Sequence, residues 1–538
     1  MLAIPGAAAG LLMVFRNSMV GGTSRWIALA AALATLVVSL GLVHDFSLLP
    51  APADTAAGAV SSPVQPRFEV SYHWLTVHSI GGAGDASKSM QMEFHFGLDG
   101  ISLALVVLTT LLTVSCVLIS WEAIREREAE FYTALLALET GLIGVFCSFD
   151  LVLFYVAFEF TLIPLFFMVG EWGGPQRRYA AVKFFLYTFA GSMITLVGVV
   201  ALVMHVSAEG LQTPCSIPAI ASWVQQHPIS PQLQAALFLA MSAGFMVKVP
   251  VIPFHTWLPL AHTEAPTAGS VLLAGVLLKL GTYGFLRLCL PLFPAACQTV
   301  GLPVIGALAV GGIIYGSLCA LAQTDVKKLV AYSSVAHLGF CVLGLFALNS
   351  AGIAGGVMQM INHGLSTGGL FLLVGMIYER YHTRQVAELH GLASRLPILA
   401  CAMVFVSMAS IGLPGLNGFV GEILSLGGMF ERHPLYAVIA TAGLVLGAWY
   451  LLSMLQTVFF GPFVEPPHGE SHVTDMNLRE ALALAPICVL CLWIGVKPQP
   501  LLDAIKPDVD RVAALYAHDG GEWAARPPLT KQVNLAKE

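Results

Sequence analysis

Charged residues are scarce in this chain. Of its 538 residues, only 10% are Asp, Glu, Lys or Arg, and 57% are hydrophobic. A typical soluble domain is about 25% charged. So few charges could not keep the many long apolar runs dissolved, which excludes an ordinary soluble protein. The net charge of −6 is too small to indicate a partner, and no basic run suggests nucleic acid binding.

Motifs of redox and nucleotide-binding proteins are also missing. The sequence has no glycine-rich nucleotide loop and no cysteine spacing typical of an iron–sulfur cluster. Cys488 and Cys491 form a CxxC, but no second pair or histidine lies at zinc spacing. His255 and His262 match no zinc pattern either, and hydrogen bonding in a loop or at a helix end explains them better. We therefore expect no metal or cofactor on this chain.

Apolar runs near the roughly 20-residue length of a membrane span recur throughout the sequence. They predict an all-α polytopic membrane protein with about fourteen transmembrane helices. Residues 47–98 form a polar connection and residues 498–538 a charged tail. The predicted spans are 1–15, 26–46, 99–121, 131–149, 150–170, 180–205, 233–254, 266–289, 300–322, 328–348, 353–378, 396–427, 435–461 and 481–497.

Lysine and arginine gather in alternate loops, which predicts the orientation of the chain. The loops after spans 4, 6, 8 and 10 carry none, and one further loop, after span 7, also lacks them. Because positive loops face the cytoplasm, both termini should lie on the other side. The basic residues follow spans 1, 3, 5, 9 and 11: Arg16, Arg25, Arg125, Arg127, Arg177, Arg178, Lys327, Lys328, Arg380, Arg384 and Arg395.

Two predicted spans are interrupted at corresponding places. Span 7 breaks after Lys248 at Pro250, and span 12 breaks at IGLPGLNGFVGE ahead of Glu422. Paired Gly/Pro-broken segments indicate the ion site of a transporter. Because five spans separate the breaks, we predict two inverted repeats, at 131–290 and 300–461. An N-terminal part (1–130) and a last helix with its tail (462–538) complete the domain division.

Ionisable residues inside the predicted spans are the candidate site residues. A charge at bilayer depth costs about 2.5–3.5 kcal/mol even on insertion scales, so each needs a reason. The functional interpretation is a proton relay, in which lysine suits proton exchange better than arginine and histidine links the ends. Structural hydrogen bonding is the alternative for each, and Glu139 and Asp150 are further candidates. The predicted relay consists of Glu159, Lys248, Lys279, His337, His363 and Glu422.

Residues 255–284, HTWLPLAHTEAPTAGSVLLAGVLLKLGTYG, closely resemble the signature of the antiporter-like subunits of respiratory complex I. FGLDGISLALVVLTTLLT, TDVKKLVAYSSVAHLGF and GLPGLNGFVGE agree with it. The resemblance implies fourteen helices in two inverted repeats. It places the family's glutamate of helix 5 and lysines of helices 7 and 8 on Glu159, Lys248 and Lys279. The charged residue of broken helix 12 falls on Glu422, where the NuoL and NuoN branches typically have lysine. The glutamate therefore favours the NuoM branch, whose mitochondrial counterpart is subunit 4.

The resemblance also implies a function and partners. It implies a proton-translocating subunit of an NADH:quinone oxidoreductase in a bacterial inner membrane, with NuoL-like and NuoN-like neighbours. NADH, FMN, iron–sulfur clusters and quinone are then expected on partner subunits, since this chain has no motif for them. Leu260 departs from the family, which usually has an acid after WLP. The alternatives are a subunit of a multisubunit cation/proton antiporter and a membrane scaffold without an ion path.

Overall fold

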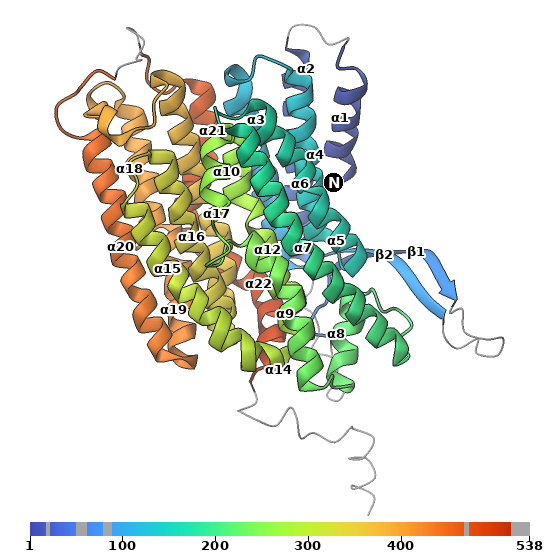
Figure 1. The fold of residues 1–538 in the computed structure, drawn as a ribbon. Coiled ribbons are helices and arrows are strands. Elements are labelled where there is room, and N and C mark those ends of the chain that lie inside the picture. Colours follow the sequence, from blue (N-terminus) through green and yellow to red (C-terminus); the bar gives the residue numbers. More distant parts are fainter. Residues whose placement is uncertain (18–21, 50–61, 79–88, 467–472, 518–538) are drawn as a thin grey trace, which may run out of the picture.

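The computed structural model is a bundle of long helices standing side by side, with a β-hairpin projecting from it (Figure 1). It describes residues 1–17, 22–49, 62–78, 89–466 and 473–517. Five of the described helices begin with an Asp or Asn side chain that accepts backbone N–H groups, which satisfies donors that the first turn leaves free. These caps are Asp99, Asp150, Asp325, Asn349 and Asn477.

The N-terminal part and the first predicted repeat combine long helices with several short helical pieces. Short π-helical turns (η) interrupt the eighth predicted span at two places. The helices are α1 (Ala3–Val14), α2 (Thr23–Leu48), α3 (Gly100–Ala123), α4 (Glu128–Cys147), α5 (Leu151–Phe160), α6 (Leu162–Trp172), α7 (Arg177–Ala208), α8 (Ile217–Gln226), α9 (Pro231–Lys248), α10 (Leu258–Glu264), α11 (Thr267–Leu272), η1 (Leu273–Leu277), α12 (Lys279–Gly284), η2 (Phe285–Cys289) and α13 (Leu290–Leu292).

The second predicted repeat and the C-terminal part are built mainly from long helices. They are α14 (Pro294–Ala296), η3 (Cys297–Ile305), α15 (Gly306–Leu321), α16 (Val326–Leu345), α17 (Ser350–Tyr381), η4 (Val386–Glu388), η5 (Leu392–Ser394), α18 (Pro397–Ile411), α19 (Asn417–Arg432), α20 (Pro434–Phe459), α21 (Leu478–Val496) and α22 (Gln499–Ala514).

Eleven helical segments of the described residues are long and apolar enough to cross a membrane by themselves. Each of the fourteen predicted spans coincides with helix, but spans 1, 7 and 12 are not among the eleven. Two of these are the spans predicted to be broken: α9 has 18 residues and includes polar Gln232, Gln234 and Lys248, and the two pieces of span 12 have 15 and 16 residues. The membrane-spanning helical class is confirmed, and the exact number of fourteen stays a prediction.

Both predicted helix breaks are present. In span 7, α9 ends at Lys248 and the chain resumes as helix only at α10. Pro250 and Pro253 stand in this gap and cannot donate backbone hydrogen bonds. In span 12, α18 ends at Ile411, and the next residue, Gly412, has a φ of 83°, in the left-handed region that glycine adopts readily. Gly415 has a φ of 92°, and α19 begins after it.

The connection 47–98 contains structure that the sequence analysis did not predict. Strands β1 (Phe68–His78) and β2 (Ser89–Leu98) pair antiparallel in the projecting hairpin (Figure 1). The alternation of Phe68, Val70 and Tyr72 with polar residues was the available signal. Helix α22 lies in the predicted charged tail, and residues 518–538 of that tail lie outside the described residues.

The ends of the helices form two faces, which we call the basic face and the second face. On the basic face, Arg127 Nη1 binds Glu171 Oε2 at 2.7 Å and Arg384 Nη1 donates to the Thr263 carbonyl at 2.6 Å. On the second face, Asp508 of α22 accepts the Gly100 N–H at 2.8 Å. It lies beside a buried ion pair in which Arg287 Nη2 is 2.5 Å from Asp99 Oδ2. The basic residues predicted in alternate loops thus lie together.

Candidate functional site

Lys248 lies at the first helix break and is 1% exposed. Its Nζ donates to the Phe158 carbonyl at 3.0 Å and to Thr161 Oγ1 at 3.3 Å. It also lies 3.6 Å from the centre of the Phe158 ring, which is cation–π distance. These contacts fall where α5 gives way to α6, so two irregular helices meet at this ammonium.

Glu159 and Lys248 both belong to the predicted relay but form no ion pair among the described residues. The two residues interact electrostatically, but in the described structure they make no ion pair within 4.0 Å. Glu159 is half-buried, and its Oε1 has no hydrogen-bond partner among the described residues. The reason is geometric: successive side chains on α5 diverge, and Lys248 takes the carbonyl of Phe158 instead.

Lys279 and His363 form a direct contact in the centre of the bundle. Lys279 is fully buried at the start of α12, directly after the π-helical turn η1. Its Nζ lies 2.5 Å from the Ala274 carbonyl and 2.6 Å from His363 Nδ1. His363 Nε2 has no hydrogen-bond partner in the part of the chain that the structure describes. One ring nitrogen therefore holds the lysine while the other is free.

His337 and Glu422 form a second contact, at the other helix break. His337 Nδ1 lies 3.0 Å from Glu422 Oε1, which also accepts from Gln359 Nε2 at 3.1 Å. The other nitrogen of His337 lies 3.3 Å from Ser410 Oγ and 3.5 Å from the Tyr450 hydroxyl. Glu422 is 3% exposed, so this carboxyl depends on protein groups and not on solvent.

The two contacts join into one series. The ring centres of His337 and His363 are 5.7 Å apart at an interplanar angle of 45°. Lys279, His363, His337 and Glu422 therefore follow one another across α12, α17, α16 and α19. The structure brings these four predicted residues together. Glu159 and Lys248 lie apart from them.

Close helix packing separates Lys248 from Lys279. Gly281 of α12 lies against α9, so closely that a methyl group there would be 2.5 Å from Val249 Cγ2 and 2.8 Å from the Phe245 carbonyl. Phe245 also packs edge-on against Phe158 and Phe285. The predicted link from Lys248 to Lys279 therefore crosses an apolar layer, and the two lysines share no polar contact among the described residues.

His262 is a candidate that the sequence analysis set aside. It is fully buried on α10, and neither ring nitrogen has a hydrogen-bond partner among the described residues. Its ring stacks on Phe371 with centres 4.6 Å apart, and it interacts electrostatically with Lys279 and Lys327. Testing HTWLPLAH only for zinc spacing missed it, although a histidine at a broken helix was itself a signal for a proton carrier.

A polar cavity opens on the basic face, beside Thr263 and Glu264, the two residues that follow His262. It has a volume of about 750 Å³, and its walls include Glu264, Lys327, Glu379, Arg380, His382 and Arg384. The buried ammonium of Lys327 donates to the Ala265 carbonyl at 2.5 Å. Glu264 Oε2 accepts the Gln176 N–H at 2.8 Å, which ties the α6–α7 loop to the broken helix.

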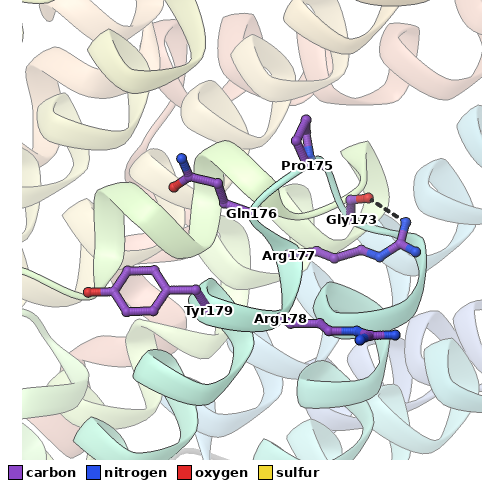
Figure 2. A pocket seen from close by; sticks show the side chains of 7 residues that line it. Gly173, Pro175, Gln176, Arg177, Arg178 and Tyr179 are labelled. Atoms are coloured by element: carbon purple, nitrogen blue, oxygen red, sulfur yellow. Dashed lines mark hydrogen bonds between the residues drawn. The ribbon is translucent and has the colours of Figure 1, made fainter.

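A second, more open hollow of about 850 Å³ adjoins this cavity (Figure 2). It is lined by residues 173–179, where Arg177 Nη1 donates to the Gly173 carbonyl at 3.4 Å. Both hollows share Gly173, Gly174 and Pro175. The basic face is thus recessed at the loop between α6 and α7.

Glu139 and Asp150, the two further candidates, have different surroundings. Asp150 Oδ1 caps α5 by accepting the N–H groups of Val152 and Leu153, so its role is structural. Glu139 is fully buried in α4, and neither carboxyl oxygen has a hydrogen-bond partner among the described residues. No group of three or more His, Cys, Asp or Glu side chains in the described ranges could hold a metal ion.

Known proteins resemble the chain over nearly its whole length. The family model "NADH:quinone oxidoreductase/Mrp antiporter, TM" matches residues 148–447. The chain is 42% identical over 527 residues to NADH-quinone oxidoreductase subunit M of Rhodobacter capsulatus, covering 96% of both. It is 41% identical over 505 residues to NADH-ubiquinone oxidoreductase chain 4 of Prototheca wickerhamii, covering 94% of this chain and 92% of that one.

Solved structures agree. A chain of respiratory complex I from Thermus thermophilus superposes with a TM-score of 0.80 at 28% identity, covering 96% of this chain and 99% of the other. A chain of the Mrp complex from Dietzia sp. DQ12-45-1b shares the fold, with a TM-score of 0.77 at 20% identity over 96% of each. The chain therefore belongs to the subunit M family of NADH:quinone oxidoreductase, the membrane-arm subunits of respiratory complex I that translocate protons.

Proposed function

We propose that protons cross this subunit along the series Lys279, His363, His337 and Glu422. The observation that carries the proposal is the sequence of contacts from Lys279 to Glu422, which runs from the π-helical turn η1 to the second helix break inside the bundle. A lysine ammonium gives a proton to His363 Nδ1, and the imidazole then releases one from Nε2. His337 receives at Nε2 and passes a proton through Nδ1 to the Glu422 carboxylate, 3.0 Å away.

Uptake takes place at the cavity on the basic face. Lys327 lines it, and His262 interacts electrostatically with both Lys327 and Lys279, while neither of its ring nitrogens has a hydrogen-bond partner among the described residues. Lys248 and Glu159 act on this path at a distance, because no direct contact joins them to the series. A change in the charge of Lys248 alters the field at Lys279 across the dry layer of Val249 and the Phe245 backbone, where charges are weakly screened.

The test is Glu422→Gln in the complete complex, with pumping measured in inverted membrane vesicles fed with NADH. Glutamine keeps the size of the side chain but cannot carry a proton, so pumping falls to background. Glu209→Gln, an exposed acid after α7, is the control and leaves pumping unchanged. Normal pumping by Glu422→Gln in fully assembled complex would show that the series is not the proton path.

We also propose the orientation of the chain and the location of the redox chemistry. The basic face is cytoplasmic in a bacterial inner membrane, because positive loops stay on that side. Both termini then lie on the other side. A cysteine introduced at Arg178 should react with an impermeant maleimide from the cytoplasm, and one at Glu431 should not. NADH, FMN, iron–sulfur clusters and quinone belong to partner subunits, so the purified chain should contain neither flavin nor iron.

An antiporter subunit driven by an ion gradient is the second candidate, supported by the fold shared with the Mrp complex chain. It requires exchange of a cation for protons without electron transfer. Vesicles energised by a sodium gradient and lacking NADH distinguish the two: proton movement there would favour the antiporter.

A further inference from the structure

Helix α19 leads from Glu422 toward the second face. Ser425, Gly428 and Glu431 follow Glu422 at intervals of three residues, so this line winds around the helix as it descends, and Glu431 lies nearly opposite Glu422. Ser425 is fully buried, and its hydroxyl has no hydrogen-bond partner among the described residues. A buried polar group left without a partner destabilises the folded state, so the position needs an explanation beyond packing.

Two glycines give the Ser425 hydroxyl its place between α16 and α17. A methyl group on Gly344 would come within 2.6 Å of Ser425 Oγ, and one on Gly355 within 2.8 Å. Any side chain at either position would collide with the hydroxyl. The Ser425 side chain therefore occupies a notch between the backbones of α16 and α17 at Gly344 and Gly355, one turn beyond Glu422.

Polar groups lie at both ends of this notch. Toward Glu422, Gln359 donates to the carboxylate while its own Oε1 has no partner among the described residues. Toward the second face, Asn349 Nδ2 donates to the Gly428 carbonyl at 2.8 Å and to Glu431 Oε2 at 3.2 Å. Glu431 is exposed. The line thus runs from a buried carboxyl to an exposed one.

We propose that protons leave Glu422 along this line, past the Ser425 hydroxyl, and emerge on the second face beside Asn349 and Glu431. This outlet rests on the proposed function, since it begins at the last residue of the series. A hydroxyl can accept a proton on a lone pair while it gives up its own, so Ser425 passes a charge without keeping it. Each proton that Glu422 loses is released on the second face, and the protonation state of Glu431 is unchanged at the end of the transfer.

The experiment is Ser425→Ala in the complete complex, compared with Ser407→Ala. Ser407 is a matched control because it is a fully buried serine on α18, the other half of broken helix 12, with a hydroxyl that also lacks a partner among the described residues. Pumping and NADH:quinone turnover should fall roughly a hundredfold in Ser425→Ala, the low end of what a lost proton-transfer group costs. They should be unchanged in Ser407→Ala. The solvent deuterium isotope effect on turnover should rise only in Ser425→Ala, which a packing defect would not produce.

The outcomes separate this outlet from the path that feeds it. If Ser425→Ala pumps as Ser407→Ala does while Glu422→Gln is inactive, the outlet is wrong and the proposed function stands. If Ser425→Ala does not assemble, Ser425→Cys decides, because it keeps the size and a weak donor. Slowed pumping with a raised isotope effect in Ser425→Cys supports the outlet, and wild-type pumping overturns it. Glu431→Gln should slow pumping less, since solvent can accept the proton there.

Discussion

The two helix breaks hold ions of opposite charge in different ways. Lys248, at the first break, is held by a backbone carbonyl, a threonine hydroxyl and an aromatic ring. Glu422, at the second, is held only by side chains, from His337 and Gln359. A cation can use the carbonyls and rings that any helix offers, whereas a buried carboxylate needs N–H or O–H donors. The second break therefore depends on particular partner residues.

The two regions also end differently on the second face. Near the first, the buried ion pair of Asp99 and Arg287 closes the bundle against α22, with Asp508 beside it. Near the second break, the neutral side chain of Asn349 donates a hydrogen bond to Glu431, and the Glu431 carboxylate is exposed to solvent. The positive charge of Arg287 repels a proton that approaches the second face near the first break. Protons are therefore expected to be released beside the second break.

The largest effect on proton pumping is expected from substitutions that remove the ionisable group at either helix break. Lys248→Ala and Glu422→Ala should both abolish proton pumping in the assembled complex, because each deletes an ionisable group from a dry site. Pumping is measured in inverted vesicles with NADH. Lys506→Ala, an exposed lysine on α22, is the control with unchanged pumping. If either variant pumped protons normally, Lys248 and Glu422 would not both be required for the same proton path.

Removing one partner from each ion should distinguish the breaks. Gln359→Leu should slow pumping roughly tenfold, since it takes a donor from a buried carboxylate. Thr161→Val should slow it only about twofold, because Lys248 keeps the Phe158 carbonyl and ring. Comparing the two rates in one vesicle preparation checks this. Equal losses would contradict the difference in how the two ions are held.

A smaller effect is the pH dependence of the stability of α22, which packs near the Asp99–Arg287 ion pair on the second face. Burial, and then the negative charge of Asp99, raise the pKa of Asp508 to about 7 against the pull of Arg287 and Arg511. A carboxyl whose pKa is raised on folding stabilises the fold at low pH, and this contribution is lost as the pH rises through 7. Hydrogen exchange of α22, corrected for intrinsic rates, should therefore be faster at pH 8 than at pH 6.

Asp508→Asn is the control for this pH effect. Asparagine keeps the acceptor for the Gly100 N–H but does not titrate near pH 7, so exchange in α22 should no longer change between pH 6 and pH 8. A pH dependence that survives in Asp508→Asn would assign the effect to another group.

The smallest effect is expected at Leu260. The family usually has an acid there, yet the half-buried leucine packs against the apolar core. Leu260→Asp should change NADH-driven pumping by less than about twofold, because its neighbour His262 already supplies a titratable group on α10. A gain of several-fold would mean that this chain lacks part of an uptake path.

Much of the architecture could be predicted from the sequence because membrane spans follow composition. Apolar runs located the helices, and prolines and glycines located both breaks. The hairpin β1–β2 was missed because its alternation is short and lies in a polar connection. Helix α22 was missed because its mixed charge resembles a tail. Neither has the long apolar run that marks a spanning helix.

The candidate site divides in the same way. Each ionisable residue at bilayer depth could be recognised from its surroundings in the sequence, since burial of charge is costly wherever it occurs. The sequence could not show which of these residues contact one another. The sequence analysis placed Glu159 and Lys248 in one relay with the other four residues and left out His262, because contacts across helices depend on rotation about each helix axis.

The sequence by itself determined that this chain is a membrane protein with two broken helices and buried ions, because hydrophobic length and helix-breaking residues act locally. Only the tertiary structure decided that Lys279, His363, His337 and Glu422 form one series. It also decided that Lys248 stands apart behind the packing of Gly281. The reason is that side chains from four helices meet only when the helices pack. The positions of glycines such as Gly281 and Gly355 then fix which polar groups can reach one another.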